Sequence, residues 1–443
     1  PAIRRAGLLG AARGIYWLAA ESHEPRDHRL LGELLDEALA EMPEHPLIRQ
    51  MASSSCAGRN TGAARGMPCT PAMKRAPSVP WQPQDATNLD GAPAWASAQW
   101  RMRARMEEIT RYWVRQRQRE NGELGGGWGD DVEILRQWGP LALGLGSALA
   151  EEGLRRMAEG LWRSGILKDG YNAKVDDVEH SAEPSSDTLP LLAAVAPFDA
   201  GARSKLAISA ACAYHWIAPM PDGFWRFRSS WFNCSEHDPA SERAVDVHLN
   251  ARAAGPAIWH AWLARDKKLI ALLENWGRSW LAAMRSEGGG KPKGMIPPAV
   301  RSADGHYLLG PSWDKPDVEW DYFQWSPGSQ ESIAFLFLDL AELTGNIQWR
   351  DAAREAFDAI GLPLPGRPDA ADLGALLGRL AGEMERAASK LGFDFDMFTR
   401  EVIYTDRIYY PLPAALAPYL FGGPPPRGDR GPQFAVTWPP SEG

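Results

Sequence analysis

The sequence has few of the features that assign a chain to a metal-binding, nucleotide-binding or membrane-spanning class. Its 443 residues include four cysteines, and their spacing does not match a zinc ribbon or a redox motif. Cys56 could pair with Cys69 and Cys212 with Cys234, or all four could be free thiols. P-loop, dinucleotide-binding, kinase and G-x-S-x-G motifs are also lacking, so nucleotide chemistry and serine hydrolysis have no support.

Membranes and nucleic acids are not expected as partners. No apolar stretch approaches the ~20 residues that cross a bilayer. The formal net charge of -8 argues against phosphate binding, which needs a concentrated Lys/Arg surface. Hydrophobic residues make up 44% of the chain, which is enough for a sizeable core.

Tryptophan is the one residue type in clear excess, with 20 copies. Some of these side chains fill the core, and others could line a cleft where a flat indole stacks on a sugar ring. The best cleft candidates stand beside Gly, Pro, Asp or Asn in expected loops: Trp128, Trp225, Trp231, Trp313, Trp320 and Trp325.

Helical periodicity dominates the chain and favours an all-α fold. We predict a helical pair over residues 1–50, a long loop over 51–97, a main helical body over 98–420 and a tail over 421–443, forming one domain. Short and long connections alternate in the main body, as in an (α/α)6-type toroid of helical hairpins with its long loops on one face. A helical solenoid is the alternative, and short strands are expected only near 224–232 and 402–410. The predicted helices are 3–20, 28–42, 98–119, 131–149, 152–164, 186–197, 202–217, 250–263, 267–284, 327–344, 347–360, 370–391 and 410–420.

A glycine-rich segment over residues 121–133 is the first candidate site. Its glycines permit tight turns or a close approach of the backbone to a ligand. Trp128 is followed by Asp130 and Asp131, which places an aromatic ring beside carboxylates, as a sugar site requires. The alternative is a helix-capping box, with Asp130 as N-cap and Glu133 three residues later.

A second candidate is the acidic segment 171–187, which we expect to be a loop. Crowded carboxyl groups oppose one another's ionisation, and the resulting rise in pKa suits a general acid. The same oxygens could bind Ca²⁺, or the segment could be a solvated loop with Ser186 capping the next helix. Its acidic residues and histidine are Asp176, Asp177, Glu179, His180, Glu183 and Asp187.

Two further segments contribute polar and aromatic residues. Hydrogen-bond donors that could neutralise a uronate carboxylate gather between 224 and 252, as a lyase would need. Near 320–326, aromatic residues precede a helix that Ser326 is expected to cap. The candidate residues from these segments are Trp225, Arg228, His248, Asn250, Arg252, Trp320, Tyr322 and Trp325.

The sequence from Trp128 to Asp131, Trp-Gly-Asp-Asp, and the acidic segment ending at Asp187 loosely resemble the six-hairpin (α/α)6 glycosidases. The unsaturated glucuronyl and rhamnogalacturonyl hydrolases have a similar Trp-x-Asp-Asp sequence. The resemblance spans residues 98–360 and implies that Asp131 and a second carboxylate near Asp187 act on the substrate. If so, replacing Asp131 with Asn should abolish turnover with little loss of stability.

These features lead to three hypotheses about function. The first is a glycoside hydrolase that cleaves an acidic, uronate-containing polysaccharide or its oligosaccharides with a carboxylate pair. The second is a polysaccharide lyase that uses His248 and Tyr322 as base and acid, and the third is a non-catalytic glycan-binding toroid. We expect no cofactor, with Ca²⁺ as the alternative. The sequence does not assign a location, although it favours a secreted or periplasmic one over a cytoplasmic one. The predicted catalytic residues are Asp131, Asp187, His248 and Tyr322, and the predicted substrate-binding residues are Trp128, Asp130, His180, Trp225, Arg228, Asn250, Arg252, Trp320 and Trp325.

Overall fold

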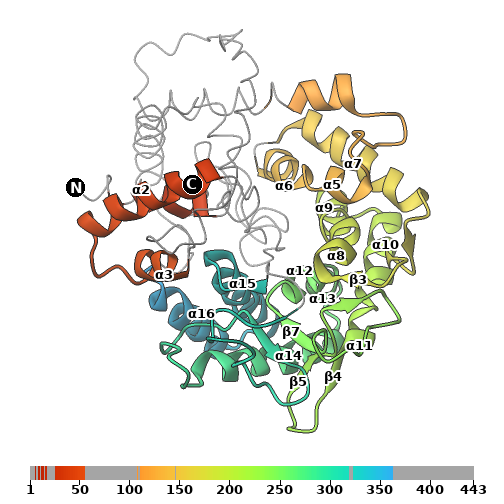
Figure 1. Ribbon diagram of the computed structural model, residues 1–443. Helices are drawn as coiled ribbons and strands as arrows, with labels where there is room; N and C mark the ends of the chain where they lie inside the picture. Colours follow the sequence, from red (N-terminus) through yellow and green to blue (C-terminus); the bar gives the residue numbers. More distant parts are fainter. Residues whose placement is uncertain are drawn as a thin grey trace. The chain divides into compact units, whose positions relative to one another are not determined.

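The computed structural model describes residues 25–54, 110–144, 146–318 and 323–362, with a few single positions before residue 25 and at 107. The chain divides into two compact units. The first contains helices α2 (Pro25–Glu41) and α3 (Pro46–Ser54), which pack against each other. Helix α2 confirms most of the predicted helix over 28–42, whereas α3 was not among the predicted helices (Figure 1).

The second unit is mostly helical, as the sequence predicts (Figure 1). No helix in the described ranges is long and apolar enough to pass through a membrane. Its α-helices are α5 (Trp128–Val132), α6 (Leu135–Gly139), α7 (Ala148–Arg163), α8 (Val178–Ser186), α9 (Leu189–Val195), α10 (Ala200–Ala210), α11 (Ala213–Trp216), α12 (Asn250–Ala253), α13 (Gly255–Ala264), α14 (Lys267–Arg285), α15 (Pro327–Thr344) and α16 (Ile347–Ala359). Two short π-helices are η2 (Trp113–Arg117) and η3 (Pro140–Gly144).

The strands of this unit are two or three residues long and form antiparallel pairs. They lie in the connections between helices and hold those connections together. One pair joins the acidic segment to a distant part of the chain, because Asp177 in β3 lies opposite Trp231 in β6. The pairs are β1 (Leu167–Lys168) with β2 (Tyr171–Asn172), β3 (Asp176–Asp177) with β6 (Trp231–Phe232), β4 (Ile217–Pro219) with β5 (Trp225–Phe227), and β7 (Val245–Val247) with β8 (Ala299–Arg301).

Helices α15 and α16 form an antiparallel hairpin whose ends follow from the sequence. Ser326 caps α15 by accepting a hydrogen bond from the Ser329 amide, and Pro327 occupies the first turn. Gly345 ends the helix with a φ of 69°, a left-handed conformation that glycine adopts without strain. Asn346 then caps α16, and the predicted cap at Ser326 is confirmed.

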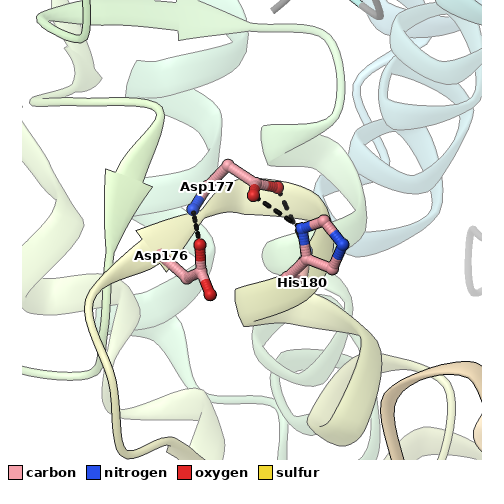
Figure 2. Close-up of side chains that lie close together, drawn as sticks. All are labelled: Asp176, Asp177 and His180. Atoms are coloured by element: carbon pink, nitrogen blue, oxygen red, sulfur yellow. Dashed lines mark hydrogen bonds and ion pairs between the residues drawn. The ribbon is translucent and has the colours of Figure 1, made fainter.

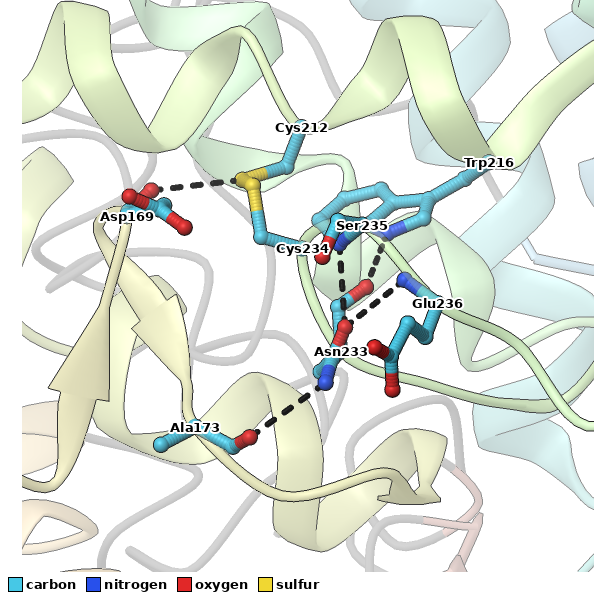
Figure 3. The surroundings of a disulfide bond; sticks show 8 residues. All are labelled: Asp169, Ala173, Cys212, Trp216, Asn233, Cys234, Ser235 and Glu236. Carbon is cyan, nitrogen blue, oxygen red and sulfur yellow. Dashed lines mark hydrogen bonds between the residues drawn. A yellow bond between two sulfur atoms is a disulfide. The ribbon is translucent and has the colours of Figure 1, made fainter.

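A disulfide bond joins Cys212 to Cys234, one of the two pairings that the sequence allowed (Figure 3). It ties the loop after β6 to the start of α11. Beside it, the Trp216 indole donates a hydrogen bond to the Asn233 backbone carbonyl, and the Asn233 side-chain nitrogen donates to the Ala173 carbonyl. These contacts fix the end of β6, and therefore the strand β3 that pairs with it. Cys56 and Cys69 lie outside the described residues.

The segment predicted as an acidic loop over 171–187 contains helix α8, so that prediction is wrong. Asp177 starts the helix by accepting hydrogen bonds from the amides of Glu179 and His180. Pro184 lies inside the helix and has no N–H for the His180 carbonyl. The Asn172 side chain donates to that carbonyl at 3.1 Å, which compensates for the missing helical hydrogen bond.

The prediction of one continuous helix over 131–149 is also wrong. The structure divides this segment into α5, α6 and η3 before α7 begins at Ala148. Glycines at 139, 144 and 146 lower the helical propensity of the segment, and Gly146 has a φ of 66°. Ser147 then caps α7 by accepting from the Ala150 amide.

Candidate functional site

Asp131 holds the glycine-rich turn in place. Its carboxylate accepts hydrogen bonds from three consecutive backbone amides, those of Leu124 at 2.6 Å, Gly125 at 2.9 Å and Gly126 at 2.9 Å. Both oxygens are used, and only 7% of the residue is exposed. Gly125 and Gly127 have φ values of 110° and 108°, which side chains disfavour. Asp131 therefore positions the turn, and its hydrogen bonds leave it poorly placed to exchange a proton with a substrate.

The turn places Trp128 at the start of α5. Gly127 is the N-cap of this helix and Asp130 lies in its first turn, so the alternative prediction of a capping box at Asp130 and Glu133 is wrong. Trp128 is half-buried and rests against Gly160, where an added Cβ would lie 3.0 Å from the indole. Asp130 is exposed.

We expect the Asp131→Asn variant to lose stability, because an amide nitrogen would then face backbone N–H groups that need an acceptor. The expected decrease in the free energy of unfolding is about 2 kcal/mol, the size of one hydrogen bond to a charged group. Urea unfolding measures it. An Asp131→Asn variant with unchanged stability but no activity would instead support the catalytic role that the family resemblance implies.

Three glutamates meet beside this turn. Glu133 follows α5, and Glu179 and Glu183 lie one helical turn apart on α8. One carboxylate oxygen from each lies within 4.8 Å of the others. Glu133 is the most accessible of the three, with 18% of its side chain exposed. We call Glu133, Glu179 and Glu183 the carboxylate cluster.

Two buried arginines neutralise part of this charge. Arg136 contacts Glu133 and lies 3.3 Å from Asp187. Arg252 is fully buried, and its Nη2 lies 2.6 Å from the Asp187 carboxylate. Arg252 also lies 3.5–3.9 Å from each member of the carboxylate cluster. We call Arg136 and Arg252 the arginine pair.

Glu183 is the unusual member of the carboxylate cluster. Burial raises its pKa to about 9, opposed by Arg252 and reinforced by the negative charge of Glu133. Its residue is 4% exposed, and its Oε2 atom has no hydrogen-bond partner among the described residues. Gly129 lies beside this oxygen, since an added Cβ there would lie 3.4 Å from Oε2. Glu183 is therefore a protonated carboxylic acid at neutral pH, next to a backbone position without a side chain.

His180 forms a second polar group on α8. Its Nδ1 lies 2.6 Å from the Asp177 carboxylate, which faces the ring, while Asp176 accepts from the Asp177 amide (Figure 2). The bond to Asp177 raises the pKa of His180 to about 9, although burial opposes the shift. His180 is therefore a cation at neutral pH, with half of its side chain exposed. Burial also raises the pKa of Asp176.

Several predicted site residues are buried and make contacts with other parts of the protein rather than facing a substrate. Asp187 is buried between the two arginines, and Arg252 is buried with it rather than open to a substrate. Asn250 donates to Asp246 at 2.8 Å inside the core. His248 is buried between β7 and α12, and Trp325 is 1% exposed against Trp313.

Other predicted residues are exposed or lie outside the described residues. Trp225 is half-buried in β5, and Arg228 is exposed. Arg228 contributes to the lowered pKa of His237, which burial lowers most. Trp320 and Tyr322 lie outside the described residues.

Comparison with known proteins gives no relative for this chain. No family model, curated protein or solved structure matches it. The chemistry of the site is therefore inferred from its own geometry.

The geometry of the carboxylate cluster disfavours a bound metal ion. Three carboxylate oxygens within 4.8 Å could in principle coordinate Ca²⁺. However, the Arg252 guanidinium already lies within 3.9 Å of all three glutamates, and a divalent cation would be repelled by it. Asp176, Asp177 and His180 form a second group, but there Nδ1 is already bonded to Asp177.

Proposed function

We propose that the protein is a glycoside hydrolase in which Glu183 is the general acid. The observation that carries this proposal is a buried, protonated carboxyl group whose unpartnered oxygen lies beside Gly129. Cleavage of a glycosidic bond requires a proton for the departing oxygen, and a carboxylic acid with a raised pKa supplies it at neutral pH.

Glu179 is the proposed second carboxylate. It lies on the same face of α8 as Glu183, and the contact with Arg252 at 3.8 Å favours its ionised form. Retaining glycosidases place their two carboxyl groups ~5 Å apart, whereas inverting ones leave room for a water molecule. The cluster oxygens lie within 4.8 Å of one another, so the proposed mechanism is retaining.

The architecture proposed for the second unit is the (α/α)6-type toroid that the resemblance implies. Its mostly helical composition and its α15–α16 hairpin are compatible with that fold. In this proposal Trp128 stacks on a sugar ring next to Glu183, since Trp128 and Gly129 adjoin in α5.

The alternative of a lyase has less support from the described residues. A lyase needs groups that stabilise a carboxylate and remove a proton next to it. Asn250 is bonded to Asp246, and Arg252 is enclosed by carboxylates, so neither is placed to receive a uronate.

Incubation with a panel of polysaccharides and oligosaccharides tests the proposed reaction. A hydrolase creates reducing ends without new ultraviolet absorbance, whereas a lyase creates a conjugated double bond that absorbs. NMR of the first product formed distinguishes retention from inversion. Absorbance rising together with reducing ends would contradict the hydrolase, and products of inverted configuration would contradict the assignment of Glu179.

A further inference from the structure

The Cys212–Cys234 disulfide lies where three segments of the chain meet (Figure 3). Cys212 lies just after helix α10, and Cys234 lies two residues after the end of β6. The Cys212 Sγ atom is 3.5 Å from the carbonyl oxygen of Asp169, in the turn between β1 and β2. The same turn rests on α10, because a Cβ added at Gly170 would lie 2.7 Å from the Ser209 amide nitrogen. The disulfide therefore links β6 to a packed part of the unit, and both cysteines are buried.

Strand β6 is in turn bonded to the residues before and after His180. Phe232 lies opposite Asp176 in β3, the strand that leads into α8. The Ser181 hydroxyl hydrogen-bonds to the Phe232 carbonyl at 2.7 Å and to the Asp176 carbonyl at 3.1 Å. Within the described ranges, β3 pairs with no strand other than β6. A displacement of β6 is therefore passed directly to the first turn of α8.

The contact between Asp177 and His180 depends on this first turn. One Asp177 carboxylate oxygen accepts from the amides of Glu179 and His180, and the other lies 2.6 Å from His180 Nδ1 (Figure 2). Asp177 is buried, whereas half of the His180 side chain is exposed. The other charged groups near the ring are Asp176, Glu179 and Glu183, and Asp177 has the largest effect of them on His180. The protonation of the ring therefore reports how closely Asp177 is held.

We propose that the Cys212–Cys234 disulfide holds the Asp177 carboxylate against His180, so that the oxidation state of the two cysteines controls this contact. Reduction takes up two electrons and two protons, breaks the S–S bond and leaves two thiols. The end of β6 is then held by non-covalent contacts such as the hydrogen bonds of Asn233. Without covalent closure, such a segment opens locally more often. The inference is independent of the proposed function, since the contact exists without a substrate.

Proton NMR of the full-length protein tests this coupling, with dithiothreitol as the reductant. Dithiothreitol supplies both electrons and both protons and becomes a cyclic disulfide. The His180 ring signals are those missing from the spectrum of His180→Gln. In the oxidised protein the pKa of His180 should be about 9, and reduction should weaken its proton affinity about tenfold or more, toward the ordinary pKa of about 6.5.

Two results of this experiment would overturn the inference. One is an unchanged His180 titration in protein whose two new thiols are verified by alkylation and mass spectrometry. The other is alkylation of Cys212 or Cys234 in the unreduced protein, which would show that the disulfide does not form.

Hydrogen exchange distinguishes a local effect from general unfolding. The amides of Glu179 and His180, which donate to Asp177, should exchange about tenfold or more faster after reduction. The amides inside helix α15 should keep their exchange rates. Acceleration to the same degree in both regions would show that the disulfide stabilises the whole unit and does not position Asp177.

A variant of the oxidised protein tests the connection through β6. Ser181→Ala removes the hydroxyl that bonds Phe232, and it should weaken the proton affinity of His180 by about threefold, the effect of one hydrogen bond. Ser164→Ala is the matched control, because that hydroxyl donates to the Leu161 carbonyl at the end of α7, and an unchanged titration is expected. Equal shifts in the two variants, or no shift in Ser181→Ala, would contradict transmission through β6.

Discussion

The Glu183→Gln variant should lose about 100- to 10,000-fold in kcat, the usual contribution of a general acid. Gln has nearly the shape of a protonated Glu but cannot release a proton to a departing oxygen. Glu183 must take up a proton when the wild type folds at neutral pH, whereas Gln needs none, so the variant should be more stable than the wild type there. Steady-state kinetics on a substrate from the glycan panel, with urea unfolding at the same pH, measures both quantities.

Asp339→Asn is a matched control for this variant. Asp339 is also buried, with a pKa raised well above its usual range by burial and an Oδ1 atom that has no partner among the described residues. It lies on α15 and contacts neither the carboxylate cluster nor the arginine pair through any ion pair or hydrogen bond in the described structure. Its amide variant should keep normal kcat. Equal kcat in the two variants would show that Glu183 is not the general acid of the reaction.

The Arg252→Met variant should be the most destabilised single variant, losing about 3–5 kcal/mol of unfolding free energy. Met preserves much of the side-chain length but leaves Asp187 and the carboxylate cluster without their shared cation. Buried carboxylates that lose a partner are costly because they have no water to solvate them. Chemical unfolding followed by circular dichroism measures the loss.

Two further variants serve as controls for the loss of stability in Arg252→Met. Arg278→Gln removes an exposed arginine that lies 3.1 Å from Glu274, and such pairs contribute less than about 1 kcal/mol. Arg252→Lys keeps the charge without the forked guanidinium, so an intermediate loss is expected and the variant should fold even if Arg252→Met does not. A loss for Arg252→Met no larger than for Arg278→Gln would show that the buried ion pairs do not hold these helices together.

Local signals in the sequence predicted much of the fold. The caps at Ser326 and Asn346 and the turn glycine at 345 are set by neighbouring residues, so the α15–α16 hairpin was predictable. Helix α8 was not predictable, because a proline such as Pro184 usually ends a helix. The Asn172 side chain compensates for the missing N–H of Pro184, and this is a contact that the sequence does not show. Reading 178–186 as a helix would have placed Glu179, Glu183 and Asp187 on one face.

The candidate site was predictable in composition but not in role. The glycine-rich turn and the acidic segment do meet, as the sequence hypothesis requires. Asp131 and Arg252 were predicted to be functional because the sequence shows that they are polar but does not show which groups they bond in the folded protein. The partners are three backbone amides and a set of carboxylates up to 119 residues away, since Arg252 pairs with Glu133. The pKa of Glu183 likewise depends on burial that the sequence does not show.

Glu183 is protonated in the folded protein at neutral pH, and the pH dependence of stability tests this protonation most directly. Its folded pKa is about 9, whereas an unfolded glutamate titrates near about 4.3. Between these values the folded state binds the extra proton, so stability is fully present below the unfolded pKa and is lost as pH rises toward the folded one. The slope from one such proton approaches about 1.4 kcal/mol per pH unit.

The decisive comparison is urea unfolding of the wild type and of Glu183→Gln at several pH values from about 5 to 9. His180, whose pKa is also raised, is present in both proteins, so its contribution largely cancels in the difference. The predicted result is that the variant becomes progressively more stable than the wild type as pH rises. Parallel stability curves across this range would contradict a protonated Glu183 and the acid role built on it.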